Sequence, residues 1–99
     1  MAKSRGKILL IEDDKNLGFI IKDFLEMSKF NVILRDNGQD GLKEYLKKSF
    51  DLVLLDIMLP LVDGFTVAEE IRKQNCEIPI IFITAKSASD PIIIAPFFG

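Results

Sequence analysis

The residues best suited to chemistry are polar side chains that directly follow apolar runs. The stretch "KILLIEDD" ends on Glu12, Asp13 and Asp14, the run "FDLVLLD" ends on Asp56, and the run "IPIIFIT" ends on the hydroxyl of Thr84. Carboxylates held a few ångströms apart repel one another unless a cation neutralises them or one of them takes up a proton. If the fold brings the ends of these runs together, they form an oxygen-rich site for a cation.

Oxygen ligands alone favour a hard divalent cation. Mg²⁺ is held by a few carboxylates, keeps several waters and leaves room for phosphoryl oxygens. The sequence contains no histidine, which excludes a His-ligated zinc site, a Ser-His-Asp triad and a phosphohistidine carrier. We therefore expect the acids to hold Mg²⁺. Other roles stay open for single residues: Asp13 or Asp14 is also suited to capping a helix, and Thr84 to ending a strand.

The elements that position these residues follow from the hydrophobic pattern. Nearly continuous apolar runs predict buried strands over residues 7–12, 31–35, 50–56 and 78–84. Apolar residues at helical spacing predict three intervening helices, with inner faces carrying Leu17, Ile20, Ile21, Phe24 and Leu25, then Leu42, Tyr45 and Leu46, then Phe65, Ala68 and Ile71. Strands that alternate with helices predict an α/β fold, a doubly wound parallel sheet, whose ligands bind at the carboxyl ends of the strands.

Composition indicates a soluble chain of one domain. It has 99 residues, of which 48% are apolar and 28% charged. The single cysteine, Cys76, cannot form an internal disulfide, which favours a reducing cytoplasmic setting, and we expect its thiol to be buried. No apolar run approaches the roughly 18 residues of a membrane helix. A net charge of −2 without a basic stripe argues against direct nucleic-acid contact.

Three motifs, "ILLIEDD", "LVLLDIMLPLVDGF" and "IPIIFITAK", resemble the receiver domain of bacterial two-component response regulators, which has the CheY-like (flavodoxin-like) fold. The match covers residues 7–87 of a domain spanning 1–99, and "DIMLP" is most similar to the branch with a winged-helix DNA-binding domain. The resemblance implies a cytoplasmic signalling domain rather than a turnover enzyme. It also implies a sensor histidine kinase as partner and a DNA-binding output domain in the full-length protein.

The resemblance further implies roles for single residues. Asp56 would be the phosphoacceptor, which receives a phosphoryl group from the phosphohistidine of the kinase. Glu12 and Asp13 would be the acidic pair at Mg²⁺, and Met58 would offer its backbone carbonyl to the ion. Thr84 would be the switch hydroxyl that bonds a phosphoryl oxygen. The turn after the phosphoacceptor would be formed by Pro60, Asp63 and Gly64, with glycine supplying backbone angles that a side chain forbids.

The tail "SASDPIIIAPFFG" departs from the family pattern. Receivers continue with a helix, a fifth strand ending in Lys-Pro and a further helix, whereas Ala95 stands here in place of that lysine. Lys86 is the nearest substitute cation, and Ile92 stands where an aromatic switch residue is expected. Only seven residues separate Thr84 from Ile92, too few for a parallel crossover.

The domain is therefore expected to be incomplete after its fourth strand, through natural or engineered loss of residues. "IIIA" would pair elsewhere, extend outward or join another subunit. Apolar sheet surface left uncovered would favour a homodimer or a swapped assembly through the C-terminal surface.

Three functional hypotheses stay open from the sequence. The first is a Mg²⁺-dependent phosphoacceptor. The second is a receiver-like interaction module that is not phosphorylated, which the missing lysine favours. The third is a phosphatase with Asp56 as nucleophile, which is weaker because Met58 occupies the position where such enzymes usually place a second acid.

Overall fold

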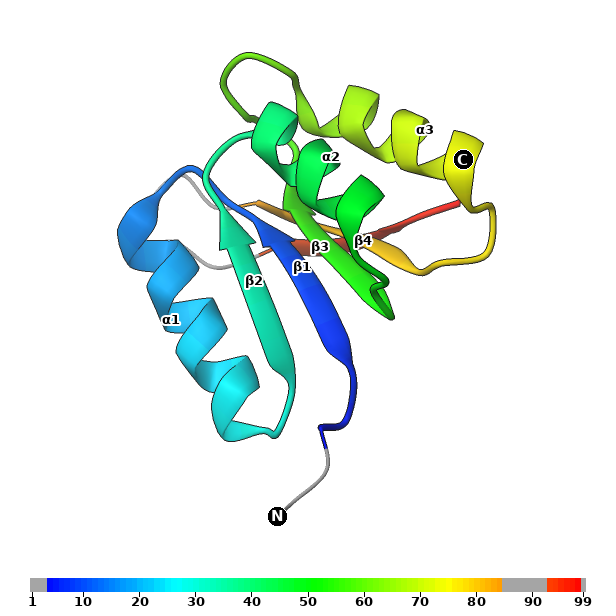
Figure 1. Cartoon of the computed structure of the whole chain (residues 1–99). Helices are drawn as coiled ribbons and strands as arrows, with labels where there is room; N and C mark the ends of the chain where they lie inside the picture. Colours follow the sequence, from blue (N-terminus) through cyan, green and yellow to red (C-terminus); the bar gives the residue numbers. More distant parts are fainter. Residues whose placement is uncertain (1–3, 85–92, 99) are drawn as a thin grey trace.

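The strands form one sheet in the order β2-β1-β3-β4-β5. The structure, a computed structural model, describes residues 4–84 and 93–98. Its elements are β1 (Lys7–Ile11), α1 (Lys15–Met27), β2 (Asn31–Arg35), α2 (Gly38–Lys47), β3 (Leu52–Asp56), α3 (Gly64–Gln74), β4 (Ile80–Thr84) and β5 (Ile93–Phe97). The first four strands are parallel, and β5 runs antiparallel to β4 (Figure 1). The predicted α/β class with a mainly parallel sheet is confirmed.

Helices cover both faces of the sheet. In Figure 1, α1 lies on one face, where it packs on β1 and β2, while α2 and α3 lie on the other. An apolar cluster fills each interface, because strands buried on both faces carry apolar residues almost continuously. The core on the α2 and α3 side includes Leu9, Ile11, Val53, Leu55 and Phe82; the core on the α1 side includes Ile8, Leu10, Val32, Leu54 and Ile83. Among the described residues, no helix is long and apolar enough to cross a membrane.

The register of the sheet aligns the carboxyl ends of its central strands. Ile11 pairs with Leu55, and Asp56 pairs with Ile83. The residues that follow β1 and that end β3 and β4 therefore share one edge, as predicted.

Polar residues cap the helices that begin at this edge. Asp14 caps α1 by accepting a hydrogen bond from the backbone N–H of Leu17, at 3.1 Å. Asp63 caps α3 by accepting from the N–H and the hydroxyl of Thr66, both at 3.0 Å. Of the two acids considered as caps of the first helix, Asp14 takes this role, which leaves Asp13 available at the edge.

Several helix residues predicted to face the core lie at the surface. Ile20 and Phe24 of α1 are 57% and 59% exposed, and Leu46 of α2 is 66% exposed. Phe65 of α3 is 49% exposed, although its ring contacts Phe82 with 4.9 Å between the ring centroids. Each helix buries a narrower stripe than its apolar residues suggest, since each lies over only part of the sheet.

One prediction about the second half of the chain was wrong. Cys76 is exposed rather than buried, because it follows Asn75, the C-cap of α3, and lies in a turn outside every apolar face. The tail forms no parallel strand, as its short connection predicted. Of the three courses left open for it, the structure shows pairing within the chain: Ile93–Phe97 form β5, which pairs antiparallel with β4, and an antiparallel strand needs no long crossover.

Arg72 of α3 holds the end of β5 against the rest of the fold. Its guanidinium donates hydrogen bonds to the carbonyls of Ile78 and Phe97 and lies 5.7 Å from the centre of the Phe97 ring. The Phe97 ring also packs edge-on against Phe82 in β4. The last residues of β5 are thus tied to α3 as well as to β4.

Candidate metal centre

Three carboxylates meet at the carboxyl edge of the sheet. Glu12 and Asp13 follow β1, and Asp56 ends the adjacent strand β3. One carboxylate oxygen from each lies within 4.8 Å of the others. Glu12 and Asp56 are only 2% and 5% exposed, whereas Asp13 is exposed. The structure therefore brings together the three acids that the sequence singled out. Two of them are buried and the third lies at the surface.

Backbone N–H groups hold the two buried carboxylates. Oε2 of Glu12 accepts from the N–H of Asp14, and Oδ1 of Asp56 accepts from the N–H of Met58, both at 3.1 Å. Oε1 of Glu12 is buried and has no hydrogen-bond partner among the described residues. A buried carboxylate oxygen without a donor is costly unless a proton or a cation reaches it.

The raised pKa values of Glu12 and Asp56 also favour a proton or a cation at this site. Burial raises the pKa of Glu12 from 4.5 to about 8, against the effect of the Asp14 N–H. Burial also raises the pKa of Asp56, although the Met58 N–H opposes the shift, and the charge of Asp13 adds to it. Without a cation, the edge therefore retains a proton at neutral pH.

This set of ligands fits a hard divalent cation. All three side chains offer oxygen, and Glu12 contributes an oxygen that no other described residue bonds. Because Asp13 is exposed, one side of the cluster is open to water. The hydrogen bond from Met58 keeps its backbone beside Asp56, while its side chain is 77% exposed.

The turn between β3 and α3 is packed tightly against the end of β3. A Cβ atom on Gly64 would overlap the carbonyl oxygen of Asp56 and lie 2.8 Å from Cα of Ile57. Gly64 is thus required by this close approach and not, as expected from the sequence, by special backbone angles. The left-handed conformation belongs instead to Leu61, with φ of 71°, an outlier for a bulky residue that the sequence did not indicate.

The remaining predicted residues divide between the described and undescribed parts of the chain. Thr84 ends β4 beside β3, next to Ile83, the register partner of Asp56. Its hydroxyl makes no hydrogen bond with another described residue, so its assignment depends on its place at the edge. Lys86 and Ile92 lie outside the described residues. Ala95 lies in the middle of β5, opposite Phe82, so no lysine is supplied at that point of the strand.

A five-stranded, helix-covered sheet with buried acids at the carboxyl ends of its central strands defines a CheY-like receiver fold. The chain belongs to the response regulator receiver domain family, whose model matches residues 8–95. It is 45% identical over 87 residues to the transcriptional regulatory protein RprY of Bacteroides fragilis. That match covers 88% of this chain but 37% of RprY, so the chain spans well under half of this relative.

Solved receiver structures agree with the fold. The non-phosphorylated HemR receiver domain from Leptospira biflexa superposes with a TM-score of 0.78 at 38% identity, covering 86% of this chain and 68% of that one. The response regulator TrrA from Thermotoga maritima, in complex with Mg²⁺-BeF, superposes with a TM-score of 0.70 at 32% identity. This second match covers 77% of this chain and 64% of TrrA.

Proposed function

We propose that this receiver domain accepts a phosphoryl group on Asp56 from the phosphohistidine of a sensor kinase, with Mg²⁺ held by the acid cluster. One observation carries the proposal: the oxygens of Glu12, Asp13 and Asp56 converge within 4.8 Å at the carboxyl edge of the sheet. In addition, the related TrrA structure contains Mg²⁺-BeF. In this chain Glu12, Asp13, Asp56 and the backbone carbonyl of Met58 would hold the ion.

The residues divide the chemistry among them. An Asp56 oxygen attacks phosphorus in line as the bond from phosphorus to the imidazole nitrogen breaks, which leaves an aspartyl phosphate here and histidine on the kinase. The Mg²⁺ held by these residues would supply neutralisation of the charge on the transferring phosphoryl oxygens. The N–H of Met58 holds one Asp56 oxygen, which orients the other for attack. Glu12 must lose its proton for the ion to bind, and its burial makes that loss depend on the ion.

The hydroxyl of Thr84 is the proposed sensor of the new charge. Thr84 ends β4, adjacent to the strand that carries Asp56, and its hydroxyl, which bonds no other described residue, would donate to a phosphoryl oxygen. Phosphorylation adds about two negative charges, which new hydrogen bonds of this kind can turn into a local rearrangement. Ala95 offers no cation, so Lys86 is the proposed substitute.

Residues 1–99 form the proposed receiver domain of a longer cytoplasmic regulator. RprY, of which the chain matches 37%, is a transcriptional regulatory protein. We propose by analogy that a DNA-binding output domain accompanies this domain and that the receiver itself does not contact nucleic acid.

Incubation with a small phosphodonor and Mg²⁺, followed by intact-mass measurement, tests the proposal. We expect one added phosphoryl group that is lost in alkali, as an acyl phosphate is. Asp56→Asn should take up none, whereas Asp23→Asn, at an exposed acid of α1, should match the parent chain. Lys86→Ala should lower the rate of uptake if Lys86 substitutes for the missing lysine.

The same experiment separates the alternatives. A folded chain that binds Mg²⁺ but never gains mass would instead indicate an interaction module, which Ala95 favours. Sustained release of phosphate from esters, at a rate unchanged over many turnovers, would indicate a phosphatase.

A further inference from the structure

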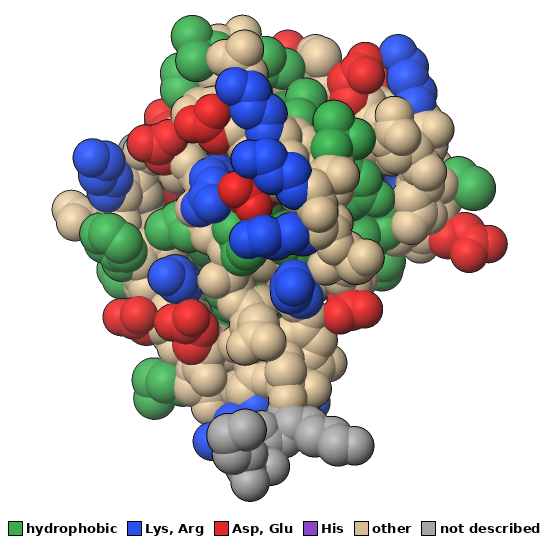
Figure 2. Space-filling view, in the orientation of Figure 1, with side chains coloured by type: hydrophobic (Ala, Val, Ile, Leu, Met, Phe, Trp, Pro, Cys, Tyr) green, Lys and Arg blue, Asp and Glu red, His purple; other side chains and the backbone are tan. Residues whose placement is uncertain are grey.

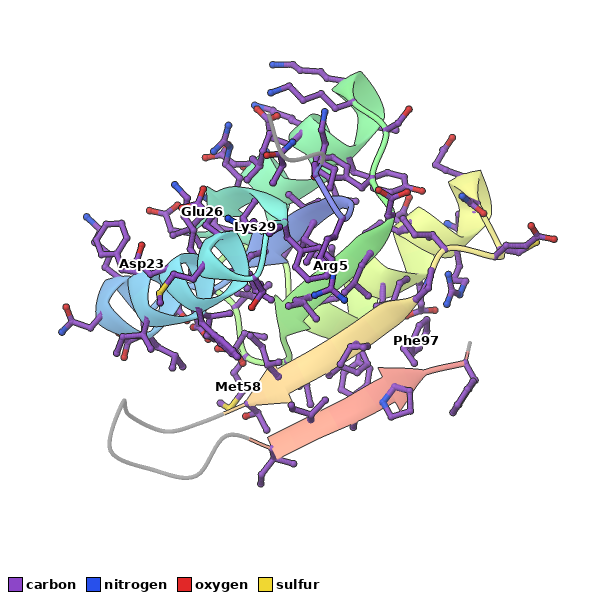
Figure 3. All side chains as sticks on the ribbon, turned by 90° about the horizontal axis from the view of Figure 1, so that it is seen from below. Arg5, Asp23, Glu26, Lys29, Met58 and Phe97 are labelled. Atoms are coloured by element: carbon purple, nitrogen blue, oxygen red, sulfur yellow. The ribbon has the colours of Figure 1, made fainter. Side chains whose placement is uncertain are left out.

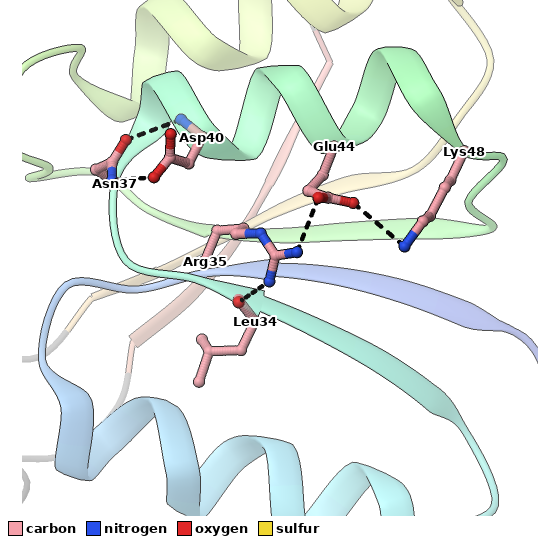
Figure 4. A network of polar contacts seen from close by, with 6 residues as sticks. All are labelled: Leu34, Arg35, Asn37, Asp40, Glu44 and Lys48. Carbon is pink, nitrogen blue, oxygen red and sulfur yellow. Dashed lines mark hydrogen bonds and ion pairs between the residues drawn. The ribbon is translucent and has the colours of Figure 1, made fainter.

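The two outermost strands of the sheet, β2 and β5, differ in how their free edges are protected against pairing with another strand. At the β2 edge, the backbone carbonyl of Arg35 accepts a hydrogen bond from the N–H of Glu12 and so points toward β1. The carbonyl of the preceding residue, Leu34, therefore points away from the sheet. The guanidinium of Arg35 covers that carbonyl at 2.7 Å and bonds Glu44 at 2.8 Å (Figure 4). Lys and Arg side chains gather over α2 and the neighbouring end of β2 in Figure 2. Charges of this kind discourage another strand from pairing at an edge.

In the part of the chain that the structure describes, the β5 edge has no such protection. Its five residues, Ile93–Phe97, include no charged side chain, and Ile93 and Ile94 are 62% and 65% exposed. Figure 3 shows β5 at the outside of the sheet, beyond β4, with Phe97 near its end. An exposed apolar edge strand is a template for pairing with another strand.

The backbone of β5 also has a defined set of free groups. The N–H of Val53 in β3 donates to the carbonyl of Pro79, just before β4. The backbone groups of odd-numbered residues from 79 to 83 therefore point toward β3, and those of the even-numbered residues of β4 point toward β5. Their register partners are the odd-numbered residues of β5. Ile94 and Pro96 therefore turn their backbone groups to the free side, where the missing N–H of proline costs no internal bond.

We propose that β5 pairs with β5 of a second copy of this chain, antiparallel and with the twofold axis at Ala95, to form a continuous sheet across a dimer. In this register the N–H of Ile94 donates to the carbonyl of Pro96 in the other copy, and the reciprocal bond forms by symmetry. The register also places Ile93 of one copy opposite Phe97 of the other. A twofold contact between identical strands closes on itself and gives a dimer rather than a fibre.

A hollow beside β5 favours this occupant. A groove of about 480 Å³ is lined by Phe97 of β5 and by Glu69, Arg72 and Lys73 of α3. Side chains at alternate positions share a face, so Ile93 points to the same side of the sheet as Phe97. Ile93 of the second copy would enter this groove against the Phe97 ring. The opposite charges of Glu69 and Lys73 avoid a repulsive surface on either copy.

Other registers and other partner strands are less favourable for β5. Pairing centred on Pro96 would bring two residues without N–H groups together and form no bond between them. Pairing of β5 with β2 of another copy would extend without closing, and Arg35 blocks that edge. The proposal does not depend on phosphorylation, so its test uses the unphosphorylated chain without Mg²⁺, and its failure leaves the proposed function untouched.

Sedimentation over a dilution series of the 99-residue chain tests the dimer. We expect the average mass to rise from monomer to dimer with concentration, and Ile93→Lys to remain at the monomer mass with unchanged circular dichroism. Ile20→Lys removes an equally exposed isoleucine from α1 and should still dimerise. A parent chain that stays monomeric at every concentration, or equal loss of the dimer in both variants, would overturn the proposal.

Cross-linking tests the register. In a Cys76→Ser background, Ala95→Cys places two thiols opposite each other at a non-hydrogen-bonded position, where Cα atoms lie about 4.5 Å apart, within disulfide range. Mild oxidation should yield a reducible dimer from Ala95→Cys and much less from Ile20→Cys in the same background. A dimer that forms without cross-linking at residue 95 would contradict the Ala95 register.

Discussion

The buried carboxylate of Glu12 lies across from the buried carboxylate of Asp56, because Glu12 follows β1 and Asp56 ends the parallel strand β3 directly after the paired residues Ile11 and Leu55. Two acids in this position cannot both be charged without a large cost in free energy. The edge has two ways to lower that cost, a retained proton or a bound cation. Proton release, cation binding and stability of the fold are therefore coupled.

The free energy of unfolding in a metal chelator should fall as pH rises from about 5 to 8. Unfolded Glu12 releases its proton near pH 4.5, whereas folded Glu12 holds it to about pH 8, so between these values the folded state binds more protons. Stability then decreases with pH, by at most about 1.4 kcal/mol per pH unit for one proton. Urea unfolding at several pH values measures the slope.

Mg²⁺ and a substitution provide the controls for this slope. Mg²⁺ should raise stability more at pH 8 than at pH 5, and Glu12→Gln should flatten the pH dependence in chelator. The range stays above pH 5 because Glu44 and Asp63, whose pKa values are lowered by Arg35 and by Thr66, lose their stabilising effect only at lower pH. Stability that rises from pH 5 to 8 in chelator would refute the coupling.

Leu61→Gly should stabilise the fold by about 0.5–1 kcal/mol. Leu61 has φ of 71°, a left-handed conformation that costs a residue with a Cβ atom about 1–2 kcal/mol. Glycine removes this strain, and its greater entropy in the unfolded chain cancels part of the gain. The side chain is 80% exposed, so little apolar burial is lost. Urea midpoints compare the variant with Leu61→Ala, which keeps the strain; a glycine variant no more stable than the alanine variant would contradict the explanation.

The strands and the acid cluster were predictable because their signals are local. A continuous apolar run that ends on an acid marks a buried strand and also its carboxyl end, and parallel topology brings such ends together. Glu12, Asp13 and Asp56 follow from this rule. Whether Asp13 or Asp14 capped α1 was not predictable, since the two differ only in the backbone angles at the turn.

Features that depend on distant partners were not predictable. Apolar spacing placed Ile20 and Phe24 on the inner face of α1, yet burial depends on how much of the sheet the helix covers, and α1 packs mainly on β1 and β2. The short connection after Thr84 excluded a parallel strand. It did not show that β5 would pair with β4, because an open strand edge carries no signal in sequence.

Gly64→Ala should destabilise the fold by about 1–3 kcal/mol and weaken Mg²⁺ binding. The added Cβ would overlap the Asp56 carbonyl and push α3 away from the end of β3, an overpacking effect. Gly18→Ala in α1 is the matched control, because its Cβ would come closest to the flexible methyl groups of Leu34, at 3.2 Å and 3.3 Å, and would lie 3.8 Å from Cβ of Glu12, an ordinary contact distance. Chemical unfolding and Mg²⁺ titration measure both effects, and equal effects at the two glycines would argue against a special role for Gly64.

Arg72→Ala should loosen β5 and destabilise the fold by about 1–3 kcal/mol. The guanidinium donates to the carbonyls of Ile78 and Phe97, so its loss leaves part-buried acceptors without their charged donor. Hydrogen exchange of the Ala95 amide, which faces β4, should accelerate more than exchange in β1. Lys73→Ala is the control, since its exposed ion pair with Glu70 contributes less than about 1 kcal/mol. If exchange in β5 is unchanged in Arg72→Ala, β5 is held by its pairing with β4 alone, and the contribution assigned to Arg72 is wrong.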